Sequence, residues 1–199
     1  MLKEFNILIT GVGGQGVILM SELLGQTAVR EGLKVRGSEV LGMAVRGGPV
    51  VSMIRFGDEI EGPVIPLGKG DVLVAMEPAE GLRNIAYLSK SGSVILNTQK
   101  IIPPTVSIGT SKYPSLEQMI EKLTSLSSKL VKLDADQIAK KAGSIQTVNI
   151  VLLGALFGLE QLPLKMERIK ESIETHFTEK AASINLKAFD LGYQACKQA

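Results

Sequence analysis

The stretch Gly11-Val12-Gly13-Gly14-Gln15-Gly16 decides the fold prediction for this chain. It follows the apolar run 5–10, which has the composition of a buried strand, and it precedes residues 17–30, whose apolar positions recur at helical spacing. A strand, a G-x-G-x-x-G turn and a helix in this order are typical of a dinucleotide-binding sheet. The stretch therefore predicts an α/β protein with a mostly parallel, Rossmann-like sheet.

The glycine turn is also the first candidate binding site. Gly11 allows a tight turn, Gly13 lets a ligand approach bare backbone, and Gly16 lets the helix start close to the strand. Unpaired N–H groups at a helix N-terminus carry partial positive charge, which suits a phosphate or another anion. Together with Gly14 and Gln15, these residues form a predicted cofactor-binding turn. The alternative is a glycine-rich turn that binds nothing, and the absence of a following Lys-Ser/Thr pair excludes a nucleoside triphosphate P-loop.

A second group of candidate ligands lies between residues 38 and 48. Ser38 and Glu39 end the predicted second strand, and an acidic residue about 20 positions after the glycines grips the ribose in dinucleotide-binding folds. Arg46, followed by Gly47 and Gly48, could hold a carboxylate or phosphate through two parallel hydrogen bonds. It could equally fix its own loop through an ion pair, and the sequence leaves both possibilities open.

Strands and helices alternate along the middle of the chain, and everything from residue 146 onward is predicted to be helical. Further strands are predicted over 49–56, 71–76, 92–98 and 129–133. Asn97 lies at the end of one of these strands, on the edge of the sheet where the glycine turn is expected. It is therefore a further candidate ligand, and the alternative, which is the commoner case, is an Asn-Thr turn that binds nothing.

Local turn signals give finer expectations. The reversal at 57–58 predicts that 59–61 pair back as a short hairpin, which would be an antiparallel excursion from the βαβ repeat. Residues 106–108 are expected to form a short strand. The last helix, capped by Thr178, is expected to bury one stripe of side chains, namely Ala181, Ile184, Ala188 and Leu191. No internal repeat or long linker divides residues 1–199, so the sequence predicts one domain.

The composition excludes several classes of protein. A net charge of +2 and an aromatic content of 4% give no case for nucleic-acid binding. One cysteine, Cys196, cannot form an internal disulfide framework or supply the thiolates of an iron–sulfur or zinc site, and it fits a reducing compartment. His176 is expected to be a solvated residue at a helix end. The start of the chain lacks the apolar core of a signal peptide, and the apolar stretch 148–159 is too short to span a bilayer, so we expect a cytoplasmic protein without membrane association.

The sequence resembles the gamma-type subunits of 2-oxoacid:ferredoxin oxidoreductases, most clearly the indolepyruvate-specific branch of that family. The resemblance covers nearly the whole chain. It rests on an ordered set of short motifs: residues 11–17, Ser38-Glu39-Val40, Arg46-Gly47-Gly48, Val51-Ser52, Arg55-Phe56-Gly57, Ile65-Pro66, Asp71-Val72-Leu73, Glu77-Pro78, Asn97-Thr98, Asn149, Leu153-Gly154-Ala155 and residues 185–189.

The resemblance implies a three-layer α/β/α fold and a role in the oxidative decarboxylation of a 2-oxoacid. Coenzyme A and oxidised ferredoxin take part in that reaction, which yields acyl-coenzyme A, carbon dioxide and reduced ferredoxin. It further implies that thiamine diphosphate, magnesium and iron–sulfur clusters sit on one or more larger partner subunits, and that this module contributes to coenzyme A binding. The chain departs from the family pattern at Leu41 and Val45, where histidine and glutamine are common.

No nucleophile–base pair, carboxylate pair or metal-ligand cluster emerges from the sequence, so we expect a chain that is not catalytic by itself. Two other interpretations remain open at this point. The glycine turn and Glu39 suit a free-standing dinucleotide-binding protein, and the chain could also be an assembly subunit without any ligand of its own.

Overall fold

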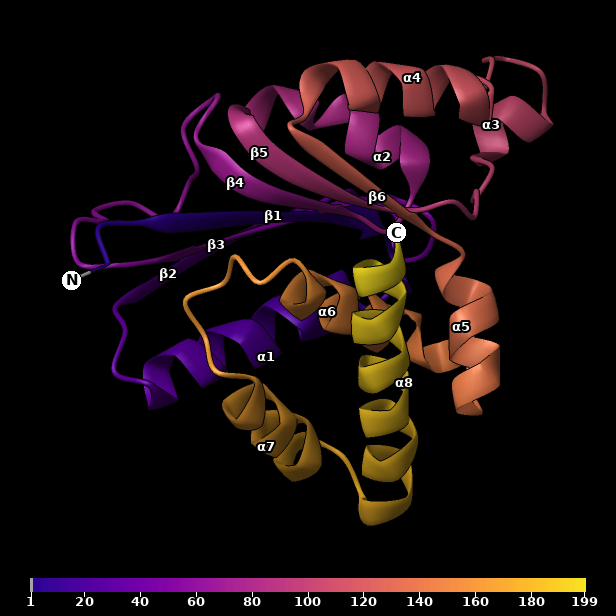
Figure 1. Ribbon diagram of the computed structural model, residues 1–199. Coiled ribbons are helices and arrows are strands. Elements are labelled where there is room, and N and C mark those ends of the chain that lie inside the picture. The colour runs from indigo at the N-terminus through magenta and orange to yellow at the C-terminus, as the bar shows by residue number, and fades with distance from the viewer. Residues whose placement is uncertain (1) are drawn as a thin grey trace.

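A computed structural model describes residues 2–199 as three layers, with one six-stranded sheet between two sets of helices (Figure 1). The strand order is β2-β3-β1-β4-β5-β6. The elements are β1 Phe5–Val12, α1 Val17–Arg30, β2 Val35–Leu41, β3 Pro49–Phe56, β4 Gly70–Ala75, α2 Pro78–Arg83, the 3₁₀ turn Ile85–Tyr87, β5 Leu88–Asn97, α3 Pro104–Ser107, α4 Leu116–Leu126, β6 Lys129–Leu133, α5 Ala135–Ala142, the 3₁₀ turn Ile145–Thr147, α6 Val148–Gly158, α7 Met166–His176 and α8 Glu179–Gln198.

Within this sheet β3 alone runs against the other strands. It pairs antiparallel with β1 and β2, whereas β1–β4, β4–β5 and β5–β6 are parallel pairs. The predicted fold class is therefore confirmed, including the antiparallel excursion. Its location was wrong, because β2 and β3 form it. Residues 59–61 form no strand, and the N–H groups of Asp58 and Glu59 donate instead to the carbonyls of Leu2 and Lys3.

One further expectation was wrong, and another was confirmed only at Ala188. Residues 104–107 form the short helix α3, because Pro104 occupies its first position, where a missing N–H costs no hydrogen bond. In α8 the buried face is rotated by about one position from the predicted stripe. The side chains it buries are Ala182, Asn185, Ala188, Phe189, Gly192 and Cys196. His176 is exposed at the end of α7, as expected.

The two faces of the sheet carry separate cores. Helices α1, α5, α6, α7 and α8 cover one face, and α2 and α4 cover the other (Figure 1). α6 is buried nearly all round, and α8 packs closely against it.

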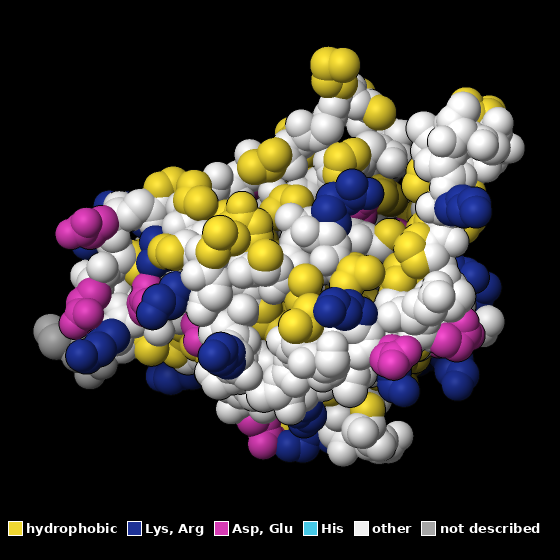
Figure 2. Space-filling view, turned by 90° about the horizontal axis from the view of Figure 1, so that it is seen from above, with side chains coloured by type: hydrophobic (Ala, Val, Ile, Leu, Met, Phe, Trp, Pro, Cys, Tyr) yellow, Lys and Arg dark blue, Asp and Glu magenta, His cyan; other side chains and the backbone are white. Residues whose placement is uncertain are grey.

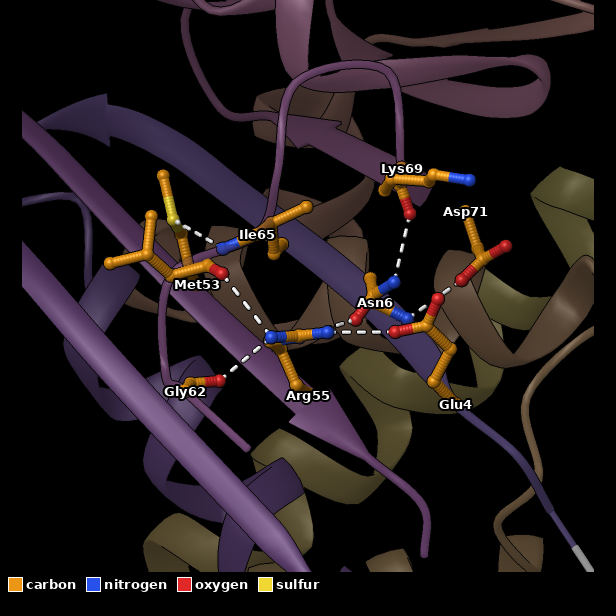
Figure 3. A network of polar contacts seen from close by, with 9 residues as sticks. Glu4, Asn6, Met53, Arg55, Gly62, Ile65, Lys69 and Asp71 are labelled. Carbon is orange, nitrogen blue, oxygen red and sulfur yellow. Dashed lines mark hydrogen bonds and ion pairs between the residues drawn. The ribbon is translucent and has the colours of Figure 1, made fainter. Parts of the chain in front are cut away.

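A buried polar network ties the segment after β3 across the amino end of the sheet (Figure 3). Arg55 is almost fully buried, and its guanidinium donates to the Asn6 side-chain oxygen at 2.8 Å and to the Gly62 carbonyl at 2.7 Å. It also pairs with Glu4 at 2.7 Å, and Asn6 in turn donates to the Lys69 carbonyl at 2.8 Å. Each buried donor is thus satisfied, which makes the network a structural clamp for residues 57–69.

The close packing of α6 on α8 depends on glycines. A Cβ added at Gly192 would lie 1.9 Å from the Val151 carbonyl oxygen, and one at Gly154 would lie 2.0 Å from the Phe189 carbonyl oxygen. Both contacts involve backbone, which cannot rotate away as a side chain can.

We predict that Gly192→Ala lowers the free energy of unfolding by about 3 kcal/mol, because the two helices must separate. Urea denaturation monitored by circular dichroism measures this change.

Gly25→Ala in α1 is the control for that prediction. Its added Cβ would meet only the terminal methyl of Ile54 at 3.3 Å, so the variant should stay within about 1 kcal/mol of wild type. Equal stabilities for the two variants would show that the α6–α8 contact does not need glycine.

Candidate functional site

The predicted ligands converge on the carboxyl edge of the sheet, with one exception. β1, β4, β5 and β6 end at this edge, and antiparallel β3 begins there, since Val12 is paired with Pro49. The glycine turn, the loop 42–48 and Asn97 therefore lie near one another. Ser38 and Glu39 do not join them, because both lie within the edge strand β2, which β3 separates from β1.

The motif predicts that the backbone at Gly13 is open to a ligand, but the loop 42–48 of the same chain occupies that space. The Gly13 N–H donates to the Gly48 carbonyl at 2.8 Å, and the Gly47 N–H donates to the Gly13 carbonyl at 3.1 Å. A Cβ at Gly13 would lie only 2.3 Å from the Val45 carbonyl oxygen. Gly13 is therefore needed so that the loop 42–48 can lie directly on the turn.

Gln15 and Asn97 are committed to the backbone at the end of β4. The Gln15 side-chain amide donates to the Met76 carbonyl at 3.0 Å, and its oxygen accepts from the Val12 N–H at 2.8 Å. Asn97, which is buried, donates to the same Met76 carbonyl at 3.3 Å and accepts from the Ala135 N–H at 3.1 Å, at the start of α5. These two amides hold the ends of β1, β4 and β5 in register.

The rest of the turn remains open to solvent on one side. Gly14 is exposed, and the N–H groups of Gly14 and Gly16 donate to no acceptor within residues 2–199. Both glycines have positive φ, at 101° and 79°, a conformation that other residues rarely adopt. A Cβ at Gly16 would collide with the Asn149 side chain, which lies against the turn from α6. Asn149 is thus a packing residue of the turn.

The loop 42–48 divides the carboxyl edge into two hollows. The first, of about 500 Å³, lies between the glycine turn, the start of α1 and the loop, and no charged side chain lines it. Leu41 and Val45, the two departures from the family pattern, contribute to its apolar wall. The second, of about 370 Å³, lies on the other side of Gly47, towards α2 and the segment 101–114. Val12 borders both.

The second hollow contains a buried acid cluster that sequence reasoning missed. Glu77 is buried, caps α2 by accepting from the Glu80 N–H at 3.0 Å, and also accepts a hydrogen bond from the Tyr113 hydroxyl. Arg83 Nε lies 3.3 Å from Glu80 Oε2 as an ion pair whose angle makes no hydrogen bond. An acid directly after a buried strand, as in Glu77-Pro78, was a usable signal, whereas nothing in the sequence pointed to Tyr113.

Burial dominates the protonation behaviour of this cluster. Burial raises the pKa of the Glu80 carboxyl, with Glu77 adding to the effect and Arg83 opposing it. Burial and the neighbouring Glu77 carboxylate also raise the pKa of the Tyr113 hydroxyl above its ordinary value. The cluster therefore keeps the tyrosine neutral as a hydrogen-bond donor, and it contains no nucleophile paired with a base.

In the view from above, onto the side of α2 and α4, hydrophobic side chains reach the surface across the middle of the molecule, whereas acidic side chains lie mostly near its margins (Figure 2).

Within residues 2–199, no three His, Cys, Asp or Glu side chains come together in a way that could hold a metal ion. In the same part of the chain, no helix combines the length and apolar character needed to cross a membrane.

A family model described as pyruvate ferredoxin/flavodoxin oxidoreductase matches residues 6–195. The chain belongs to this family. It is 45% identical to indolepyruvate oxidoreductase subunit IorB of Pyrococcus horikoshii, over 99% of this chain and 98% of that protein. The resemblance inferred from the short motifs is thereby confirmed, and the chain is homologous to subunits of ferredoxin-dependent 2-oxoacid oxidoreductases.

Solved structures of this oxidoreductase family share the fold. The gamma subunit of a keto/oxoacid ferredoxin oxidoreductase from Geobacter sulfurreducens matches 98% of this chain and 99% of its own, with a TM-score of 0.72 and 22% identity. A 2-oxoglutarate:ferredoxin oxidoreductase from Magnetococcus marinus, solved with 2-oxoglutarate, coenzyme A and succinyl-CoA bound, matches all of this chain with a TM-score of 0.76 and 21% identity. Only 32% of that longer chain is covered, so there the fold is one part of a larger polypeptide.

The Tyr113–Glu77 hydrogen bond gives a pH-dependent prediction. Because the pKa of Tyr113 is raised in the folded chain, its stabilisation is fully present below the unfolded tyrosine pKa of about 10 and is lost as the pH rises above it. Tyr113→Phe should lower the free energy of unfolding by about 1 kcal/mol at pH 7. Denaturation at pH 7 to 11 should show this difference shrinking above pH 10.

Tyr193→Phe is the matched control, since the Tyr193 hydroxyl donates to Glu160 at the surface, at 3.2 Å. Its loss of stability should be below about 0.5 kcal/mol. A wild-type-to-Tyr113→Phe difference that stays constant up to pH 11 would contradict the assignment of Tyr113 as a donor to a buried carboxylate.

Proposed function

We propose that this chain is the smaller subunit of a coenzyme A-dependent indolepyruvate:ferredoxin oxidoreductase. The observation that carries the proposal is its near-full-length likeness to proteins named indolepyruvate oxidoreductase subunit IorB, which are 44–45% identical to it in three organisms. Proteins named as common gamma subunits of pyruvate/ketoisovalerate oxidoreductases are 28–30% identical. That difference favours an aryl 2-oxoacid over a small alkyl one.

The proposed reaction is the oxidative decarboxylation of the 2-oxoacid, with coenzyme A as acyl acceptor and ferredoxin as electron acceptor. Thiamine diphosphate, when bound with magnesium, supplies carbanion stabilisation, and we assign it and the iron–sulfur clusters to one or more larger subunits. Cys196, the one cysteine of this chain, is buried, and burial raises its thiol pKa, so the residues here do not fit a cluster that needs four thiolates. The unpaired cysteine supports a cytoplasmic location.

We assign to this chain a part of the coenzyme A site at the carboxyl edge. Phosphate groups need N–H donors and cations, which the open N–H groups of Gly14 and Gly16 and the exposed guanidinium of Arg46 provide. Arg46 pairs with no acidic side chain within residues 2–199. The other predicted ligands serve as positioning residues: Gly11, Gly13, Gln15, Gly47, Gly48 and Asn97.

The alternative of a free-standing dinucleotide-binding protein was based on the glycine turn and on Glu39, and the position of Glu39 does not support it. In such folds the acidic residue that grips the ribose ends the strand beside the glycine turn. Here Glu39 lies on β2, with β3 between it and β1. The loop 42–48 lies on Gly13 and fills part of the space that a ligand would use, which favours a subunit that only assists assembly. The following two experiments distinguish such a subunit from one that binds coenzyme A.

The first experiment is reconstitution with the larger subunit encoded in the same organism. We predict that the two chains copurify and together reduce ferredoxin in the presence of indolepyruvate and coenzyme A. The larger subunit alone should be at least tenfold less active, because part of the coenzyme A site is missing. Full activity of the larger subunit alone would overturn the proposal.

The second experiment tests Arg46 directly. Arg46→Ala in the reconstituted complex should raise the KM for coenzyme A about tenfold, since one charge-assisted hydrogen bond contributes about 1.5 kcal/mol. The kcat at saturating coenzyme A should stay within twofold. Arg168→Ala, at an exposed arginine of α7, is the control and should change neither constant. Weaker association with an unchanged KM would identify an assembly subunit.

A further inference from the structure

The two most exposed large apolar side chains of the described chain, with two further exposed ones, lie on one short segment. Met43 is 104% exposed and Val45 90%, and the two residues that end β2, Val40 and Leu41, are 58% and 57% exposed. Single exposed apolar residues are ordinary on protein surfaces, but four within six consecutive positions form a patch. We call residues 40–46 the apolar segment.

Its backbone is held in place although its side chains contact little. Gly42 N–H donates to the Pro49 carbonyl at 2.8 Å, and the two hydrogen bonds between Gly13 and Gly47–Gly48 fix the other end. A Cβ at Gly48 would lie 2.6 Å from the Ala44 carbonyl oxygen, so the turn also needs glycine there. Hydrogen bonds and the glycines at positions 13 and 48 thus hold the segment in a conformation that exposes its apolar side chains to water. Such preorganisation lowers the cost of binding a partner.

The charge of the surroundings limits what can cover the segment. Arg46 is the one charge of the segment itself, the exposed Glu39 directly precedes it, and no acidic residue occurs between Val40 and Gly57. Two copies of this chain meeting through these segments would bring two Arg46 side chains close together, which is unfavourable. A suitable partner surface is apolar, with an acidic or phosphate group opposite Arg46.

We propose that the apolar segment docks into an apolar groove of the larger oxidoreductase subunit; this rests on the proposed function. The Magnetococcus marinus enzyme has the whole fold of this chain as 32% of one longer polypeptide, so there the fold has covalently linked neighbours. In contrast, 98% of the Pyrococcus horikoshii relative named IorB is covered by this chain, so that protein has almost no sequence outside the matched region. In free-standing subunits, a surface that meets those neighbours becomes an intermolecular interface.

The glycine turn then has a second task. The Val45 carbonyl of the segment lies directly against Gly13, so the glycine turn fixes the distance between the segment and the sheet. The same turn offers the Gly14 and Gly16 N–H groups beside it. Docking of the segment would therefore bring the larger subunit to the rim of the apolar hollow lined by Leu41 and Val45.

The test is the affinity of this chain for the larger subunit, measured by isothermal titration calorimetry. Val45→Asp and Met43→Asp should each weaken binding at least tenfold, because a charge would be buried against an apolar surface. Val29→Asp is the matched control. Val29 is 62% exposed near the far end of α1, and its substitution should change the affinity less than twofold.

Each outcome is informative. All three variants replace exposed side chains, so thermal unfolding should confirm that they fold like wild type. Wild-type-like affinity of both Val45→Asp and Met43→Asp would overturn the docking surface and leave the proposed function intact. A wild-type chain that does not bind the larger subunit would overturn both proposals. If the chain alone is a dimer in light scattering and Val45→Asp makes it monomeric, the segment is a self-interface and the proposal is wrong.

Discussion

The absence of a side chain at Gly13 is the constraint on which the carboxyl edge of this protein depends. With the Val45 carbonyl oxygen 2.3 Å from the position of a Cβ, any other residue would force the loop 42–48 away from β1. That loop separates the apolar hollow from the acidic one and carries Arg46. One missing methyl group therefore determines where the loop lies, what each hollow is lined with and which groups face a partner.

The antiparallel strand β3 explains why a dinucleotide-type motif serves a different purpose here. In a doubly wound sheet, the second parallel strand lies beside the first and brings its acidic end to the ligand. Insertion of β3 between them moves Glu39 one strand further away and brings the β2–β3 loop over the turn instead. The G-x-G-x-x-G spacing is kept because strand and helix still pack closely. The space that a pyrophosphate would use is partly filled by backbone.

What the sequence could predict follows from how local each interaction is. Lys129–Leu133 was predicted to the residue, because its apolar pattern lies within the segment itself. Residues 59–61 were not, since their conformation depends on the N-terminal segment more than 50 positions away. The contact of Tyr113 with Glu77 spans 36 positions and leaves no periodic trace. Individual candidate ligands were identifiable, but their grouping required the strand order.

The distribution of hydrogen bonds indicates what is left for a ligand or partner. The side-chain amides of Gln15 and Asn97 both end on the Met76 carbonyl, and Glu77 is held between a helix cap and a tyrosine. Gln15, Asn97 and Glu77 thus serve to fix the edge, whereas Glu80 Oε2 makes no hydrogen bond. Backbone N–H groups, exposed cations and apolar side chains remain. Such groups can bind an anion and a protein surface, which is the part proposed above for this edge.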